Sequence, residues 1–281
     1  MQQVRQKLRR LSARQLEFAV LLSLACLFAG CVDQAEPTAT PEAAKRYLKL
    51  RGYTFDQAGF FGAVAAQDIA TINAFLTAGI DKNIQDPSDG RTALISAAAR
   101  GDLAVVKTLL AGHVDVNVKD KGGKSALFHA IEARYDDVAQ LLLAEPKLDL
   151  NARGKNGVTA VISYVWQDRI DVVKNLLDRG ADVNLQDDDG DTALHGVAQT
   201  GNAELAELLL QKSATPNVKN KVGGTPLMWA AVYGNEKVTS LLLAHNADAT
   251  VRDEEGKTAL DWAIKNKRTK VIEILRNTKA A

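Results

Sequence analysis

The side chains best suited to metal binding are carboxylates, and they are densest in one short acidic segment. Asp187, Asp189 and Asp191 alternate there as the carboxylates of a calcium-binding loop do. The glycine of this segment, Gly190, comes too early, and its twelfth position is Ala198 where such a loop requires a bidentate glutamate. We therefore expect no calcium site, no other metal and no cofactor.

The side chains that could act as catalytic bases or nucleophiles are not arranged for catalysis. None of the 4 histidines stands at ligand spacing from another, and no serine-hydrolase, phosphate-loop or zinc-protease motif is present. We therefore expect no enzyme activity. The alternative is an enzyme whose site lies within residues 42–88, where four carboxylates occur without a partner group: Asp56, Asp68, Asp81 and Asp86.

Both cysteines, Cys26 and Cys31, lie near the N-terminus in an apolar stretch that follows a basic segment. The run without charge extends over residues 18–32, which is about 22 Å as a helix and too short to cross a membrane core of about 30 Å. A basic segment, a short apolar run and small residues at its end indicate a secretory signal. We predict a signal peptide over residues 1–30.

The end of this run, Phe28-Ala29-Gly30-Cys31, resembles the lipobox of bacterial lipoproteins. The resemblance implies cleavage before Cys31, lipid on that cysteine and stable membrane anchoring through several acyl chains. Val32 is similar to the sorting residue of outer-membrane lipoproteins, which implies an outer-membrane location facing the periplasm. Residues 31–41 would be a flexible tether. The alternative is ordinary cleavage and a soluble periplasmic product.

The composition excludes a general attraction to nucleic acid, because the formal net charge of the whole chain is only +1. At 46% hydrophobic and 25% charged residues, the chain is of the ordinary globular type. We expect a monomer.

The strongest signal is an internal repeat. A G-x-[TS]-x-[LV] string recurs with its glycine at Gly90, Gly123, Gly157, Gly190, Gly223 and Gly256. A leucine pair follows at a fixed distance in five of the copies, as in Leu109-Leu110 and Leu209-Leu210. A period of about 33 residues predicts a solenoid of stacked supersecondary units. In each copy we expect the glycine to take positive φ at a tight turn and the Thr or Ser two places later to cap a helix.

Strings such as GDTALHGVAQTGNAELAELLLQKSATPN resemble the ankyrin repeat. The resemblance implies an all-α repeat solenoid of about seven units, each a pair of helices with a hairpin-like loop, whose shared core lies between neighbours. His195 matches the structural histidine of that family. We expect a capping helix over 42–54 and an ankyrin domain over 55–281. The predicted repeats lie near 55–88, 89–121, 122–155, 156–188, 189–221, 222–254 and 255–281.

Ankyrin repeats generally bind proteins through hairpin tips and the exposed positions of the first helices, which line a concave face. By register, the candidate residues on the first helices are Arg100, Glu132, Trp166, Gln167, Gln199 and Tyr233, and those at the tips are Lys124, Asp188, Asp189, Asp191 and Lys221. Exposed aromatic side chains are favoured interface anchors, although Trp166 and Tyr233 could equally pack against neighbouring helices. Trp229 and Trp262, at a small-residue position, are expected to be packing residues.

The tips alternate between basic and acidic along the array, which could select a partner of complementary charge or simply form a solvated edge. The sequence thus predicts a scaffold that is tethered to the bacterial cell envelope through lipid on Cys31 and holds a protein partner on its concave face. The alternative is an immunity or inhibitor protein that restrains a toxin or an enzyme. Repeat fold alone does not name the partner.

Overall fold

The computed structural model describes residues 40–278, so the predicted signal peptide, Cys31 and most of the predicted tether lie outside the described residues. Within this range the regular elements are all helices, apart from one isolated bridge between Arg153 and Thr159. This confirms the expected all-α solenoid. The chain divides between Lys82 and Asn83 into two compact units, and each is described by itself.

The N-terminal unit consists of α3 (Pro41–Leu50), α4 (Gln57–Ala65) and α5 (Ile69–Thr77), with α5 packed against both others. Side chains of Thr40, Asp56 and Asp68 cap the three helices by accepting backbone N–H groups of their first turns. Phe60 and Phe75 are fully buried, and their ring centroids lie 5.6 Å apart.

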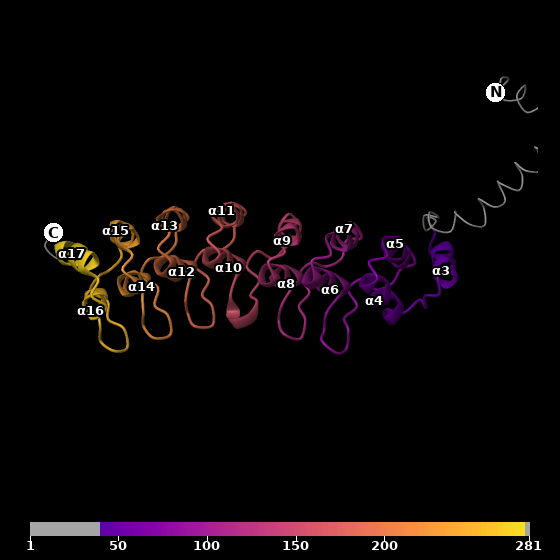
Figure 1. Cartoon of the computed structure of the whole chain (residues 1–281), viewed down its shortest axis with the longest axis horizontal. Coiled ribbons are helices and arrows are strands. Elements are labelled where there is room, and N and C mark those ends of the chain that lie inside the picture. Colours follow the sequence, from indigo (N-terminus) through magenta and orange to yellow (C-terminus); the bar gives the residue numbers. More distant parts are fainter. Residues whose placement is uncertain (1–39, 279–281) are drawn as a thin grey trace, which may run out of the picture. The chain divides into compact units, whose positions relative to one another are not determined.

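The C-terminal unit is a stack of six helix pairs in two rows (Figure 1). The inner row consists of α6 (Ala93–Arg100), α8 (Ala126–Ala133), α10 (Ala160–Trp166), α12 (Ala193–Thr200), α14 (Pro226–Tyr233) and α16 (Ala259–Lys265). The outer row consists of α7 (Leu103–Ala111), α9 (Asp136–Leu143), α11 (Ile170–Asp178), α13 (Ala203–Gln211), α15 (Glu236–Ala244) and α17 (Thr269–Thr278). A hairpin loop precedes each inner helix, and all the hairpins project to the same side (Figure 1).

The start of each inner helix follows the predicted local chemistry. All six repeat glycines have φ between 70° and 82°, as expected for a turn that disfavours other residues. The side chains of Thr92, Thr159, Thr225 and Thr258 each accept the backbone N–H three residues on, which confirms these caps. Ser125 occupies the cap position of α8 without a side-chain cap bond, so that prediction is wrong in detail.

The core of the stack lies between neighbouring pairs. On the inner helices, small residues such as Ala97, Ala230 and Ala263 are completely buried and allow close approach of the next helix. On the outer helices, the leucine pairs contribute to the core, as at Leu109 and Leu209, both 0% exposed. In the last repeat Leu275 is buried, whereas Arg276 in the second leucine position is exposed, as a terminal repeat requires.

The hairpins are joined to one another by a recurring link that we call the asparagine link. In each, an asparagine side-chain oxygen accepts the backbone N–H of a residue 31 or 32 positions later, at 2.8 Å. The five links join Asn83 to Asp115, Asn117 to Asp149, Asn151 to Asp182, Asn184 to Thr215 and Asn217 to Asp248. The links fix the distance between successive hairpins.

One junction differs from the others, and we call it the central seam, between the pair α8/α9 and the pair α10/α11. Close helix packing joins α6 to α8 and each inner helix from α10 to α16, but α8 and α10 do not approach as closely, nor do α9 and α11. Tyr164 of α10 stands where other repeats have alanine or valine, and it is only 2% exposed. Because a phenol ring is far larger than a methyl group, we expect it to keep the two inner helices apart.

Candidate protein-binding surface

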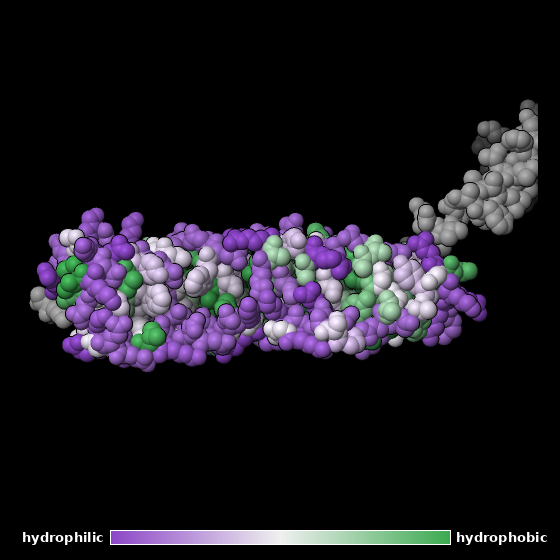
Figure 2. Space-filling model, turned by 60° about the horizontal axis from the view of Figure 1, so that its bottom comes forward, coloured by the Kyte–Doolittle hydropathy of each residue, from purple (hydrophilic) through white to green (hydrophobic). Residues whose placement is uncertain are grey.

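The surface that corresponds to the expected concave face is the exposed side of the inner helices together with the hairpin tips, and we call it the inner face. Figure 2 shows the side that carries the hairpins: hydrophilic residues cover most of it, and hydrophobic residues reach the surface in separate small areas. Such areas are the places where a partner can exclude water. The exposed large apolar residues of the inner helices and tips are Trp166, Val222, Tyr233 and Ile264.

The two aromatic candidates lie at the surface. Trp166 is 53% exposed and Tyr233 is 40% exposed. Trp166 lies over the neighbouring helix at Gly196, where an added Cβ would come within 3.1 Å of the indole Nε1. Tyr233 stacks on Trp229 with ring centroids 5.9 Å apart. Both rings are thus supported from one side and exposed on the other, which suits an anchor for a partner.

The polar candidates on the inner helices are partly occupied by contacts within the chain. The ammonium of Lys124 forms an ion pair with the carboxylate of Glu132, so these two candidates partner each other. The guanidinium of Arg100 lies 2.7 Å from a carboxylate oxygen of Asp102. Gln167 and Gln199 are partly exposed. The structure therefore brings the predicted residues to one face, and their role in binding stays a prediction.

The hairpin tips are connected by hydrogen bonds, and three of their lysines serve this purpose. The ammonium groups of Lys119 and Lys219 donate to backbone carbonyls of the next tip, Arg153 at 3.1 Å and Arg252 at 2.9 Å. The Lys121 ammonium donates to Pro87 at 2.6 Å. These cations therefore stabilise the array as well as contributing charge to its edge.

The acidic tip combines a turn-forming residue with exposed charge. Asp187 accepts the backbone N–H groups of Asp189 and Asp191, each at 2.9 Å, so its carboxylate shapes the turn. Asp188 and Asp189 are exposed, and the backbone N–H of Lys221 donates to the carbonyl of Asp189 at 2.9 Å. Burial, together with the negative charges of Asp187 and Asp189, raises the pKa of Asp191. No group of three or more metal-binding side chains occurs among residues 40–278.

The one fully buried histidine has a structural role, as the resemblance implies. His195 is 2% exposed, and its Nδ1 accepts the backbone N–H of Thr192 at 3.1 Å. Its Nε2 therefore carries the proton and donates to the carbonyl of Gly224 in the next hairpin, at 3.2 Å. Burial lowers the pKa of His195 to about 4, so the ring is neutral at pH 7.

Two of the four carboxylates that could have supported an enzyme, Asp56 and Asp68, cap helices. Asp56 accepts the N–H of Gly59 at 2.8 Å, and this hydrogen bond lowers its pKa. Asp68 is partly buried, which opposes ionisation, but hydrogen bonds from Thr71 and the guanidinium of Arg51 lower its pKa overall. A general acid at neutral pH needs a raised pKa, so these two groups are poorly suited to that role.

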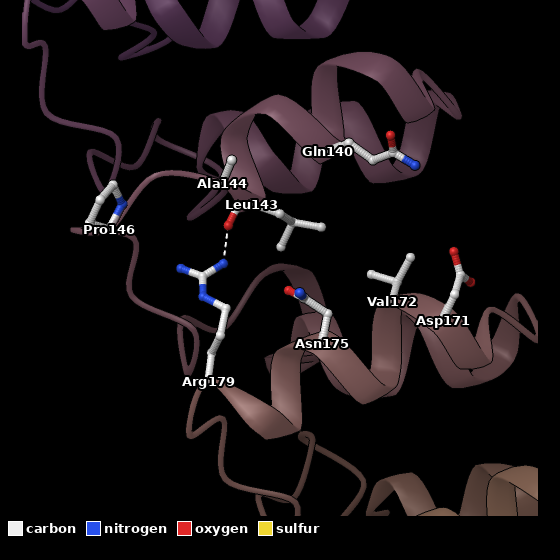
Figure 3. Close-up of a pocket in the computed structure, with 8 residues that line it drawn as sticks. All are labelled: Gln140, Leu143, Ala144, Pro146, Asp171, Val172, Asn175 and Arg179. Atoms are coloured by element: carbon white, nitrogen blue, oxygen red, sulfur yellow. Dashed lines mark hydrogen bonds between the residues drawn. The ribbon is translucent and has the colours of Figure 1, made fainter.

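A cavity of about 560 Å³ opens at the central seam between the outer helices α9 and α11 (Figure 3). It lies next to Pro146, in a loop of the repeat between Gly123 and Gly157, which is 34 residues long and so one residue longer than the usual period. The guanidinium of Arg179 points across it to the carbonyl of Leu143 at the end of α9, and it also donates to Glu145 at 3.1 Å (Figure 3). Among the described residues that line the cavity, Arg179 is the only cation, and its guanidinium is already bonded to the end of α9.

A second cavity, which the sequence analysis did not predict, lies on the inner face between the last two repeats. We call it the aromatic groove. It measures about 410 Å³, and its lining residues are Val222, Gly224, Met228, Trp229, Val232, Asp253, Glu254, Glu255 and Trp262. Trp229 and Trp262 were expected to be packing residues, but both are partly exposed and line the groove. The signal that could have revealed it is two tryptophans 33 residues apart at the same repeat position.

Comparison with known proteins agrees with this architecture of stacked helix pairs and hairpins. The family model for ankyrin repeats (3 copies) matches residues 60–154, 159–253 and 194–281, so the chain belongs to the ankyrin repeat family. Ankyrin repeats generally bind protein partners, and the family is generally not enzymatic. No curated protein matches the sequence.

Two solved structures illustrate the similarity. The ankyrin repeat domain of Bcl-3, a member of the IkappaB protein family, is 28% identical with a TM-score of 0.64, over 77% of this chain and 97% of that domain. An ankyrin repeat domain from Acinetobacter baumannii AYE is 26% identical with a TM-score of 0.60, over 66% of this chain and 97% of the other. Among the described residues, no helix is both long and apolar enough to span a bilayer.

Proposed function

We propose that this protein is a membrane-tethered scaffold of the bacterial cell envelope that binds a protein partner through its inner face. The observation that carries the binding role is Trp166, which is 53% exposed yet held in place against Gly196. A large aromatic side chain that is already immobilised loses little conformational freedom when a partner covers it, so it gives much binding energy. No catalytic group is needed for this role.

The tethering part of the proposal is supported by the lipobox-like string ending at Cys31 and by the polar segment that follows it. Nine residues separate Cys31 from Pro41, the first residue of α3, and extended chain of that length reaches about 30–35 Å. Lipid on Cys31 would therefore keep the repeats within reach of the outer membrane on its periplasmic side. The partner would be a periplasmic protein or a domain exposed to the periplasm.

The binding role is tested by crosslinking and pull-down from cells that express the native full-length protein. We expect the Trp166→Ala/Tyr233→Ala double variant to recover the crosslinked partner at least tenfold less efficiently than wild type. The matched control is Lys174→Ala/Glu204→Ala, which changes two exposed residues of the outer helices α11 and α13. Equal recovery by both double variants would remove the inner face from the proposal and leave the fold intact.

The anchor is tested separately, by metabolic labelling with a palmitate analogue. We expect label on the wild-type protein and none on Cys31→Ser. Label that persists on the serine variant would exclude lipidation at this cysteine.

A further inference from the structure

The aromatic groove has walls that are fixed before any partner arrives. The indole Nε1 of Trp262 donates to a carboxylate oxygen of Asp253 at 2.6 Å, and the ammonium groups of Lys257 and Lys265 lie 4.6 and 4.3 Å from its ring centroid. On the other wall, Trp229 is held by its stack with Tyr233. Walls that do not need to reorganise increase the affinity of whatever enters between them.

The floor and one edge of the groove are apolar. Met228 is almost fully buried, Val232 is partly exposed, and Val222 at the neighbouring hairpin tip is 60% exposed. A volume of about 410 Å³ lies in the range of about 300–1,000 Å³ that is typical of ligand sites. A large apolar side chain can therefore enter it and displace water from both tryptophans and from Val222.

The opposite edge of the groove is acidic. Of its three consecutive carboxylates, Asp253 is occupied by the indole of Trp262 and by backbone N–H groups, and Glu255 forms an ion pair with Lys257. The side chain of Glu254 is exposed and makes no hydrogen bond or ion pair within the described part of the chain. A cation next to the bound apolar side chain would therefore find an available carboxylate.

From these features we infer that the aromatic groove receives a large apolar side chain of the partner, aromatic or branched aliphatic, with a lysine or arginine beside it that pairs with Glu254. This inference rests on the proposed function and names one contact of that surface. It predicts a partner segment of the type basic–apolar–basic. A partner segment with acidic residues beside the apolar one would be rejected by the carboxylate edge.

The test uses full-length protein and defined peptides, so it does not depend on the natural partner. The chain contains 3 tryptophans, whose indole N–H signals can be followed by NMR after assignment with single Trp→Phe variants. The probes are Ac-Lys-Phe-Lys-NH₂, Ac-Lys-Ala-Lys-NH₂ and Ac-Glu-Phe-Glu-NH₂. We expect the first to shift Trp229 and Trp262 saturably and to leave Trp166 unchanged, and both others to bind at least fivefold more weakly.

Two variants sharpen the result. Glu254→Lys should reverse the preference between the Lys-Phe-Lys and Glu-Phe-Glu peptides while keeping the requirement for phenylalanine. Val232→Trp should fill the groove and abolish the shifts, whereas Ala99→Trp, at the same position of an earlier repeat, should not. Equal binding of the three peptides, or shifts that survive Val232→Trp, would overturn the inference. Neither result bears on Trp166, which lies against Gly196 outside the groove, so partner recovery by a single Trp166→Ala variant tests the proposed function independently of this inference.

Discussion

The central seam and the junction between the pairs α12/α13 and α14/α15 are built from the same repeat positions, yet they are held together differently. At the α12/α14 junction the inner helices meet through small residues such as Ala230, and His195 bonds to the next hairpin. At the central seam Tyr164 takes the place of the alanine, and the outer helices separate around a cavity. The comparison indicates that the size of the residue at this position differs between a closed junction and an open one.

At the central seam, two arginines form polar contacts where direct packing between the helices is missing. Arg169 reaches back to Asp136 of the preceding pair at 2.9 Å, and Arg179 bonds to carbonyl groups at the end of α9. The Tyr164 hydroxyl lies in this charged surrounding, and burial together with the charge of Asp136 raises the pKa of Tyr164 to about 12. Polar contacts at the edge thus replace direct helix packing at the centre.

The largest effect is expected from Tyr164→Ala. Removing a buried ring leaves a void that the separated helices α8 and α10 cannot fill, and we expect a loss of about 3–5 kcal/mol in the free energy of unfolding. Urea denaturation followed by circular dichroism gives this value. Tyr164→Phe keeps the ring, so its loss should stay below about 1.5 kcal/mol. Similar losses in both variants would show that the hydroxyl, not the ring, sets the seam.

At the α12/α14 junction, acid should act through His195. Its pKa is about 4 in the folded chain against 6.5 when exposed, so below pH 6.5 the unfolded chain binds a proton that the folded chain does not. Stability should therefore be fully present above pH 6.5 and fall by up to roughly 3 kcal/mol on acidification to pH 4. Urea midpoints measured across this range would show it.

The control for this pH dependence is a substitution at a second histidine, His245. His195→Gln should remove most of this slope, whereas His245→Gln, which changes a partly exposed histidine, should retain it. An unchanged slope in the His195 variant would assign the acid sensitivity to other groups.

A smaller loss is expected when the tight junction is made bulkier. Ala230→Leu inserts three carbons where the inner helices touch, and overpacking of this kind costs about 1–3 kcal/mol. Hydrogen exchange of α12 and α14 should become faster than in wild type. Ala104→Leu, at an exposed position of α7, should change stability by less than about 0.5 kcal/mol. An unchanged free energy of unfolding in Ala230→Leu would mean that this junction can accommodate a larger side chain.

The smallest effect should come from Arg179→Ala at the central seam. The variant loses two hydrogen bonds to the end of α9, and because the guanidinium is exposed we expect a loss of only about 1 kcal/mol. Faster amide exchange confined to the last turn of α9 and the loop after it would confirm this role. Lys174→Ala on the same helix should leave those amides unchanged.

The repeat phase was predictable from the sequence because each position of the repeat has one dominant physical requirement. Positive φ demands glycine at Gly90, a capping oxygen demands Thr92, and a buried seam demands Leu109. Six copies in register make these requirements unmistakable. The structural role of His195 was implied by the resemblance to the ankyrin repeat.

The surroundings of several large side chains on the inner helices were not predictable in this way. Tyr164 is buried at the central seam, Trp166 lies on the surface of the next helix, and Trp262 lines the aromatic groove. The outcome depends on the residue at the facing position of the next repeat, such as Gly196 beneath Trp166. Such a pairing is visible only once two repeats are placed side by side.

The asparagine links have a consequence for how such a chain can change its length. Each link joins a hairpin only to the following one, and the donor and acceptor recur at nearly constant spacing. Deletion of residues 189–221 would bring the amide of Asp248 to the side chain of Asn184, in the place that Thr215 now holds. The protein can therefore be shortened or extended by whole repeats. Its recognition surface changes in size, and every remaining asparagine link is formed again.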